Sequence, residues 1–146
     1  MTIYFATDHA GFALKETLCA YVRDVLGHHV EDCGAYEYVP TDDYPDYIRV
    51  ATHEVAKHPE TSRAIILGGS GQGEAMVANR TPHVRATVYY GGPLEIITLS
   101  RAHNDANILS LGARFLTVEE AQNAVKLWLE TPFSGEARHK NRITKF

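Results

Sequence analysis

Short runs of hydrophobic residues alternate along the chain with segments whose apolar positions recur at helical spacing. The runs predict five buried strands, over Thr2–Thr7, His29–Cys33, Arg63–Leu67, Arg85–Tyr90 and Ala106–Leu111. The other segments predict helices, over Phe12–Leu26, Pro45–Lys57, Glu74–Arg80, Pro93–His103 and Thr117–Glu130. Strict alternation of strands with helices predicts a Rossmann-like α/β fold, a three-layer α/β/α sandwich around a five-stranded parallel sheet.

Several residues mark where the predicted helices begin and end. Gly27 follows the first helix and is a typical stop, while Pro45 suits the first turn of the second. Thr117 and Glu120 have the spacing of a capping box, which predicts the start of the last long helix. Pro132 then ends that helix.

The composition fits one ordinary folded domain. With 146 residues, 45% of them hydrophobic and 22% charged, the chain is expected to form a single domain over residues 1–146. No apolar run approaches the roughly 18 residues of a membrane helix and no signal peptide is visible, so we expect no membrane partner. Cys19 and Cys33 form no disulfide framework, which favours a cytoplasmic location.

The charge is distributed unevenly. Eighteen acidic residues against fourteen basic ones give a net charge of −4, which disfavours a nucleic-acid partner. Four of the basic residues nevertheless lie in the basic segment 137–146, which could form one more short helix. On such a helix Arg138 and Arg142 would share a face, where two guanidinium groups could hold a phosphate. A solvated, frayed end is the alternative.

Polar residues and glycines collect where the predicted strands end. They are Asp8 and His9 after the first strand, Gly34–Pro45 after the second, Gly68–Glu74 after the third, Tyr90–Pro93 after the fourth and Gly112–Arg114 after the fifth. Parallel sheets bind their ligands beyond the carboxyl ends of the strands, near the point where the strand order reverses. These positions are therefore the candidates for a ligand site.

The segment Gly68–Glu74 is the strongest local signal, with four glycines in six positions between a strand and a helix. It lacks the lysine of a P-loop, the spacing of a dinucleotide fingerprint and the second glycine of a nucleophile elbow. Glycines allow backbone N–H groups to approach a ligand closely, so the loop could stabilise a developing negative oxygen. A tight turn with Ser70 at the helix start is the alternative.

The acidic and histidine residues at these ends suit proton transfer. Glu74 could be an ordinary acid of a first helical turn, but a carboxylate beside an anion-stabilising loop can also remove a proton. Asp8 and His9 could move protons between oxygens, or Asp8 could simply cap a helix. His103, next to Asn104, is either a cation at a helix end or part of a polar site.

Six segments match one protein family in the order in which they occur. They are Asp8–Lys15, Asp43–Asp46, Gly69–Arg80, Ser100–Asn107, Leu111–Arg114 and Arg138–Arg142. In these segments the chain resembles the ribose-5-phosphate isomerase B family, which includes galactose-6-phosphate isomerase subunits. The resemblance implies an α/β/α aldose–ketose isomerase that binds a small-molecule sugar phosphate and uses no metal or other cofactor. It also implies a homodimer, or a tetramer, whose active sites contain residues of both chains.

The resemblance further assigns catalytic roles. One branch of the family uses a cysteine base at the position of Gly69, where this chain has no thiol, so the base is expected to be Glu74. Ser70 would lie near the oxygens that exchange a proton. Asp8 and His103 would help to open the sugar ring.

Binding roles follow from the same resemblance. The phosphate would be held by His9, Arg114, Arg138 and Arg142, with His139 beside them. Tyr44 would line the sugar pocket. The enediolate would be stabilised by the loop that contains Gly69, Gly71, Gln72 and Gly73. The partner chain would supply His103, Asn104 and Arg114.

The expected reaction is the interconversion of ribose 5-phosphate and ribulose 5-phosphate through an enediolate. The first alternative is the same chemistry on allose 6-phosphate, galactose 6-phosphate or a tetrose phosphate. Pocket depth decides between these substrates, and it depends on the loops Gly34–Asp43 and Tyr90–Pro93. The second alternative, of another class, is a regulatory domain that binds a sugar phosphate or nucleotide without catalysis.

Overall fold

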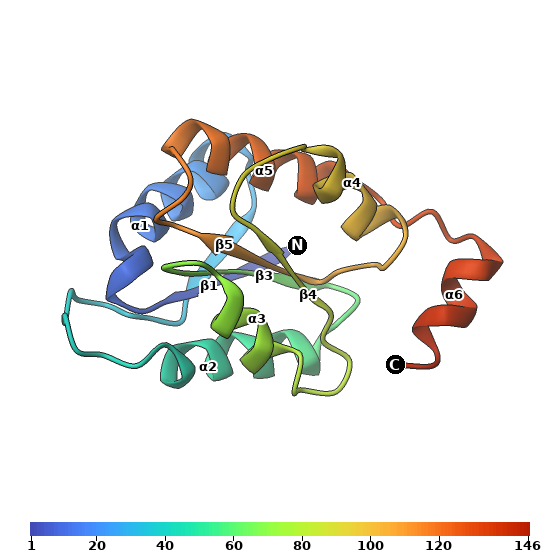
Figure 1. Cartoon of the computed structure of the whole chain (residues 1–146), viewed down its shortest axis with the longest axis horizontal. Helices are drawn as coiled ribbons and strands as arrows, with labels where there is room; N and C mark the ends of the chain where they lie inside the picture. Colours follow the sequence, from blue (N-terminus) through green and yellow to red (C-terminus); the bar gives the residue numbers. More distant parts are fainter.

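The computed structural model describes all residues, 1–146, and contains one five-stranded sheet (Figure 1). The strands are β1 (Thr2–Thr7), β2 (His29–Asp32), β3 (Ser62–Gly68), β4 (Ala86–Tyr89) and β5 (Ile108–Gly112). All neighbouring strands are parallel, in the order β2-β1-β3-β5-β4. The predicted five-stranded parallel sheet is therefore confirmed.

Helices form the outer layers of the molecule. They are α1 (Phe12–Ala20), α2 (Tyr44–Lys57), α3 (Gln72–Ala78), α4 (Glu95–Ala102), α5 (Val118–Glu130) and α6 (Ala137–Ile143). In Figure 1, α1, α4 and α5 cover one face of the sheet and α2 and α3 the other, which is the predicted three-layer arrangement. The last helix, α6, lies apart from both layers at one end of the molecule. None of these helices has the length and hydrophobicity that crossing a membrane requires.

Two helix boundaries illustrate what the sequence pattern resolves. The first helix, expected over Phe12–Leu26, ends as an α-helix at Ala20 and continues as a π-helical turn over Tyr21–Val25. The capping box before α5 is present. The Thr117 hydroxyl accepts from the Glu120 N–H at 3.2 Å, and the Glu120 carboxylate accepts from the Thr117 N–H at 2.8 Å.

Each face of the sheet buries its own hydrophobic cluster, because successive side chains of a strand point to opposite faces. On β3, Ile65 and Leu67 belong to a cluster with residues of α1 and α5, which include the fully buried Trp128. The intervening Ile66 belongs to a second cluster with Ile48 of α2. The near-continuous apolar sequence of β3 thus reflects burial on both faces.

The strand order reverses between β1 and β3. The chain leaves β1 to form β2 on one side and then crosses to form β3 on the other. In the register of the sheet Thr7 pairs with Leu67, and the Thr7 hydroxyl donates to the Leu67 carbonyl at 3.0 Å. The segments that follow these two residues therefore leave the sheet side by side, where parallel sheets bind ligands.

A buried lysine fixes the end of β2 and the loop that follows it. The Lys15 side chain of α1 is fully buried, and its Nζ donates to Asp32 Oδ2 at 2.6 Å and to the Ala35 carbonyl at 2.8 Å. The Asp32 side chain is 34% exposed, so water still reaches one partner of the pair. Removing the ammonium would leave the Ala35 carbonyl without a donor in a buried position.

We expect Lys15→Met to lower the free energy of unfolding by about 2–3 kcal/mol, because it breaks a buried ion pair and leaves a buried carbonyl without a hydrogen-bond donor. Lys57→Met is the matched control, since Lys57 makes an exposed pair with Glu54 at the same distance of 2.6 Å. That control should change the free energy of unfolding far less, because water and salt screen an exposed pair. Urea denaturation measures both values, and equal losses would contradict a special role for Lys15.

Candidate active site

A cavity of about 550 Å³ opens where β1 and β3 end. Its lining residues are Asp8, His9, Ala10, Tyr44, Gly69, Ser70, Gly73, Glu74, Arg114 and Phe115. They come from the segments after β1, β3 and β5 and from the start of α2. Eight of these ten residues were predicted as site residues from the sequence, and they meet at the predicted edge of the sheet. No cysteine lines the cavity.

The glycine loop forms one wall, and its shape depends on close packing. Gly71 has a φ of +76° and precedes the first residue of α3, so α3 begins at Gln72, two residues before the predicted start at Glu74. The Ser110 hydroxyl donates to the Gly71 carbonyl at 2.6 Å and holds the loop against β5. Gly71 and Gln72 complete the loop without lining the cavity.

Glu74 places a buried carboxylate in this wall. Glu74 is only 4% exposed. A Cβ atom added to Gly68 would collide with the Glu74 carboxylate, so this carboxylate lies directly against the backbone of β3. Burial raises the pKa of Glu74 above its ordinary value of 4.5, and the negative charge of Asp8 raises it further. A hydrogen bond from its own backbone N–H acts in the opposite direction. A carboxylate with a raised pKa in a cavity wall suits proton abstraction near neutral pH.

Tyr44 and Arg114 flank the glycine loop from two other elements. A Cβ atom added to Gly73 would lie only 2.5 Å from the Tyr44 hydroxyl, and one added to Gly69 would lie 3.4 Å from Arg114 Nη1. The exposed Arg114 side chain thus passes over the loop and brings a positive charge to the cavity. The absence of side chains at these two glycines leaves room for both groups.

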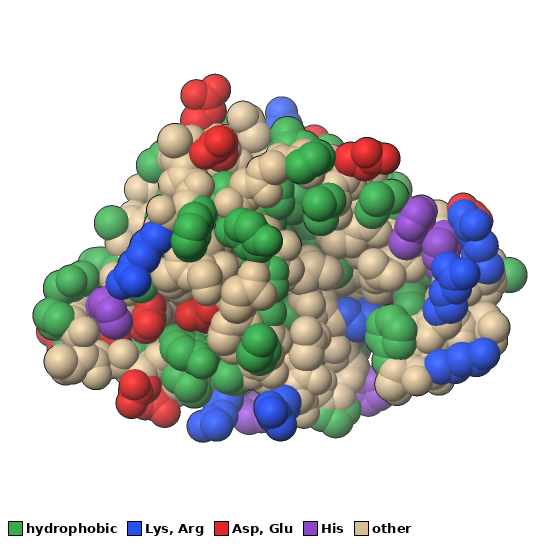
Figure 2. All heavy atoms as spheres, in the orientation of Figure 1, with side chains coloured by type: hydrophobic (Ala, Val, Ile, Leu, Met, Phe, Trp, Pro, Cys, Tyr) green, Lys and Arg blue, Asp and Glu red, His purple; other side chains and the backbone are tan.

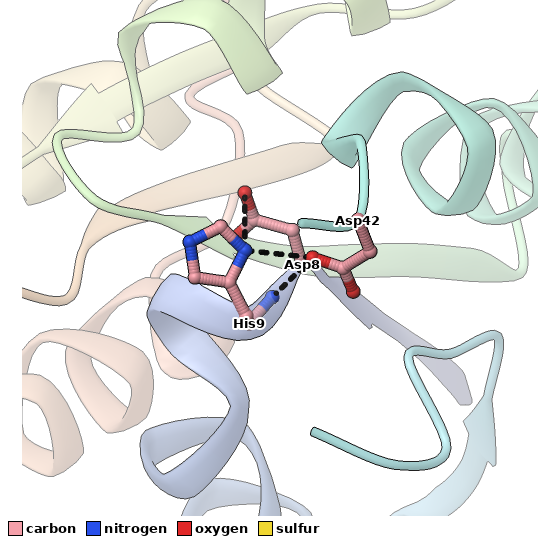
Figure 3. Close-up of side chains that lie close together, drawn as sticks. All are labelled: Asp8, His9 and Asp42. Carbon is pink, nitrogen blue, oxygen red and sulfur yellow. Dashed lines mark hydrogen bonds and ion pairs between the residues drawn. The ribbon is translucent and has the colours of Figure 1, made fainter. Parts of the chain in front are cut away.

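His9 is held by a carboxylate that the sequence analysis did not single out (Figure 3). Asp42 Oδ1 accepts from the His9 backbone N–H at 3.0 Å and lies 2.7 Å from Nδ1 of the ring. Asp8 Oδ2 lies 3.8 Å from the same Nδ1, while Asp8 Oδ1 accepts from the Ala10 N–H at 2.9 Å. The edge of the His9 ring also meets the Tyr38 ring, with centroids 6.2 Å apart.

The Asp8, His9 and Asp42 side chains are also the group that could hold a metal ion. Their three ligand atoms lie within 4.8 Å of one another. In the structure Nδ1 of His9 is engaged by Asp42 instead, and both carboxylates point toward that nitrogen (Figure 3). The geometry is that of a hydrogen-bonded group.

A second cluster of predicted site residues lies at the other end of the molecule. The rings of His103 and His139 stack with centroids 4.2 Å apart, which joins the end of α4 to α6. Burial lowers the pKa of His139, and repulsion from His103 lowers it further. Asn104 lines a separate cavity of about 380 Å³ on this side, together with Phe146. Lys, Arg and His side chains gather over α6 in Figure 2.

The two clusters divide the predicted site within one chain. The cavity is not lined by the predicted site residues at the end of α4 and on α6. These residues are His103, Asn104, Arg138, His139 and Arg142. Arg138 forms an exposed pair with Glu136 at 2.9 Å. The expectation that Arg114 comes from a partner chain is wrong for this cavity, because Arg114 lines it together with Asp8 and Glu74 of its own chain. Arg114 follows β5, which pairs with β3, so the sheet itself brings it there.

Three residues at the cavity were missed. Asp42 lies in the predicted loop between β2 and α2, where nothing in its sequence context distinguishes it from Asp43. Ala10 and Phe115 are the neighbours of His9 and Arg114, which the sequence did mark. Asp42 could have been found only through the packing of its loop against the end of β1.

Comparison with known proteins agrees with the fold. A family model described as Ribose/Galactose Isomerase matches residues 3–146. A ribose-5-phosphate isomerase B of Mycolicibacterium paratuberculosis is 39% identical over 143 residues, which are 98% of this chain and 87% of that protein. The protein of the same name from Mycobacterium tuberculosis is 39% identical over 144 residues, covering 98% and 86%.

Solved structures resemble the whole chain. Ribose-5-phosphate isomerase B of Mycoplasma genitalium, with bound ribulose-5-phosphate, superimposes with a TM-score of 0.93 at 32% identity, covering 99% of this chain and 92% of that one. The ribose 5-phosphate isomerase of Thermotoga maritima has a TM-score of 0.90 at 38% identity, covering 99% and 95%.

We expect the Glu74 carboxyl to titrate above pH 4.5 in the folded protein, because burial disfavours its charged form. Asp8→Asn should lower this pKa part of the way, since it removes a nearby negative charge but leaves the burial. Carbon-13 NMR titration of glutamate side chains, assigned with Glu74→Gln, measures both values. A pKa at or below 4.5 in the unmodified chain would contradict this description of the site.

Proposed function

The chain belongs to the ribose/galactose isomerase family, and on that premise we propose that it interconverts ribose 5-phosphate and ribulose 5-phosphate through an enediolate. The observation that carries the proposal is the buried Glu74 carboxylate in the cavity wall, next to a loop of glycines. An aldose–ketose isomerisation needs a base at C2 and a group that stabilises the resulting anion. Both lie here within one cavity.

Glu74 is the proposed base. It removes the proton from C2 of the open-chain aldose and returns it to C1, while a hydroxyl proton passes from O2 to O1. Its raised pKa brings the carboxylate closer to neutral pH, which strengthens it as a base while it remains mostly ionised. Ser70 lines the same cavity and lies next to the oxygens that exchange the hydroxyl proton in this proposal.

The loop Gly69–Gly73 is the proposed anion site. Negative charge develops on O1 and O2 when the C2 proton leaves, and backbone N–H groups of the loop can donate to it. Loss of one such donor in other enzymes reduces the rate by roughly 10²–10³. The absence of side chains at Gly69 and Gly73 lets the substrate approach the backbone on the same side as Glu74.

The phosphate end of the substrate is proposed to lie between His9 and Arg114 of one chain and the basic segment of a second copy. Arg138 and Arg142 are exposed on α6, away from their own cavity, so they can serve only the cavity of another chain. His103, Asn104 and His139 lie on the same side as α6 and would enter the shared site with it. Asp8 of one chain and His103 of the other would then open the sugar ring.

Exposed apolar side chains support association with a second copy. Figure 2 shows hydrophobic side chains gathered over the middle of this face. The exposed hydrophobic residues on α3, on α4 and after β4 and β5 include Met76, Tyr90, Ile96 and Phe115, each more than half exposed. Tyr90 and Phe115 contact each other, with ring centroids 6.1 Å apart. A surface of this kind is typical of protein interfaces.

We expect the purified chain to convert ribose 5-phosphate to ribulose 5-phosphate with a higher kcat/KM than allose 6-phosphate, galactose 6-phosphate or erythrose 4-phosphate. Galactose 6-phosphate belongs in the panel because the matching family includes galactose isomerases. A higher value for another sugar phosphate would replace the proposed substrate. Binding without any turnover would favour a regulatory domain instead.

We expect Glu74→Gln to reduce kcat by at least about 10³-fold with little change in ligand affinity, because the amide keeps the shape but cannot accept the C2 proton. Glu95→Gln is the matched control, since Glu95 also lies in the first turn of a helix but is exposed. That control should retain full activity. Near-native turnover of Glu74→Gln would show that another group is the base.

Arg142→Ala should mainly raise KM, and mixing it with Glu74→Gln should restore activity if the site is shared. In a mixed dimer one site receives Glu74 from one chain and Arg142 from the other, and is intact. Subunit exchange followed by the isomerase assay measures the gain over the two separate variants. Light scattering and mass spectrometry show whether the mixture contains mixed dimers. If it does and the activity does not rise, the shared site is contradicted.

A further inference from the structure

Asp42 is an acid of low exposure whose closest polar contacts are with His9, while Tyr47 approaches its carboxylate as well. The side chain is 7% exposed, and its hydrogen bonds go to the backbone N–H and the ring of His9. The other oxygen, Oδ2, is buried without a hydrogen-bond partner. A buried carboxylate oxygen without a hydrogen-bond partner lowers stability, so packing alone does not account for an acid at this position.

The hydrogen-bond chemistry fixes where the proton of His9 lies. Burial alone would raise the pKa of Asp42, but the hydrogen bonds from the His9 backbone and ring outweigh it and hold this pKa below its ordinary value. Asp42 is therefore ionised at neutral pH, and an ionised carboxylate can only accept hydrogen bonds. At 2.7 Å from Asp42 Oδ1, Nδ1 of His9 must be the donor. The proton of the neutral ring thus resides on Nδ1.

The second ring nitrogen makes no hydrogen bond within the chain. Nε2 of His9 lies on the side of the ring opposite Asp42 (Figure 3), and His9 lines the cavity that also contains Arg114. Asp42 restrains the ring at Nδ1 and the backbone at the N–H, so both the position and the direction of Nε2 are set.

We propose that Asp42 is a positioning residue for substrate binding, which fixes the direction of His9 and keeps a proton on Nδ1, so that the ring meets the phosphate group through Nε2 as a doubly protonated cation. This inference rests on the proposed function, because it assumes a phosphate at His9. With Nδ1 already protonated, donation from Nε2 to a phosphate dianion requires a second proton on the ring. The ring is then a cation between two anions, Asp42 on one side and the phosphate on the other.

A simpler role would be to tether the loop between β2 and α2 to the end of β1. The two roles respond differently to Asp42→Asn. The asparagine carbonyl can still accept from the His9 backbone N–H and keep the loop in place. Its amide, however, carries no charge and can donate to an unprotonated Nδ1, so the doubly protonated ring that donates to the phosphate loses its stabilising partner.

The test compares Asp42→Asn with Asp43→Asn, a control with the same change of charge at an exposed neighbour. We expect Asp42→Asn to raise KM for ribose 5-phosphate about tenfold with kcat within about twofold, because it weakens phosphate binding in both the ground state and the transition state. The dissociation constant for inorganic phosphate, measured by calorimetry, should rise by a similar factor. Asp43→Asn should change neither quantity.

A double-mutant cycle and NMR complete the test. In a His9→Gln background, Asp42→Asn should have little further effect, since Asp42 acts through His9. Long-range proton–nitrogen NMR should show His9 protonated at Nδ1 in the unmodified chain, with the proton shifted toward Nε2 in Asp42→Asn. Multiplicative effects of the two substitutions, an unchanged affinity for phosphate, or an unprotonated Nδ1 in the unmodified chain would each overturn the proposal.

The phosphate and NMR measurements do not depend on turnover. If the unmodified chain fails to isomerise any sugar phosphate, the proposed function fails while the tautomer of His9 is still measured. If it isomerises ribose 5-phosphate but Asp42→Asn leaves KM and phosphate affinity unchanged, only the role of Asp42 fails.

Discussion

The parallel pairing of β1 with β3 is the constraint on which the candidate site depends. The register that places Thr7 opposite Leu67 brings the next residues of both strands to the same edge of the sheet. Asp8 and His9 thus emerge beside the glycine loop, although about sixty residues of chain separate them. A shift of this register by one residue would turn the side chains of β3 to opposite faces and expose its core. Burial of both faces therefore fixes the geometry of the cavity.

Two carboxylates of low exposure line the cavity and a third lies beside it against His9, an arrangement that a structure selected for stability alone would avoid. Asp8, Asp42 and Glu74 each lose hydration, and each is compensated by a different means. Asp8 accepts a backbone N–H, Asp42 accepts two hydrogen bonds from His9, and Glu74 accepts its own N–H. The compensation is least complete at Glu74, whose pKa is raised, while the pKa of Asp42 is lowered. The pKa values of Glu74 in the cavity wall and of Asp42 beside the cavity are thus shifted in opposite directions, as expected when one acid accepts protons and the other stays charged.

The sequence predicts the fold well, because the helical spacing of apolar residues and the short apolar runs of the strands are both clear. β3 is apolar throughout since it is buried on both faces, and the capping box at Thr117 is a purely local signal. The residues of the glycine loop are equally local, so Glu74 could be marked as a candidate from its position alone. The role of Asp42 could not, because it arises only when the loop after β2 packs against the end of β1. The place of Arg114 was wrong for a similar reason, as it depends on β5 pairing beside β3.

The charge asymmetry of the chain follows from this division of the site. Two carboxylates, those of Asp8 and Glu74, line the cavity of one chain, and Arg114 is the only arginine or lysine among its lining residues. The tail holds Arg138 and Arg142 on an exposed helix, and Arg142 has no acidic partner there. The net charge of −4 on the whole chain disfavours binding of this segment to a polyanion such as a nucleic acid. In the proposed function the acidic cavity binds a phosphate dianion, and it would then be complementary to the basic helix, on which Arg142 has no acidic partner. Electrostatics thus favours the same arrangement as the exposed apolar surface, in which the tail of one copy completes the cavity of another.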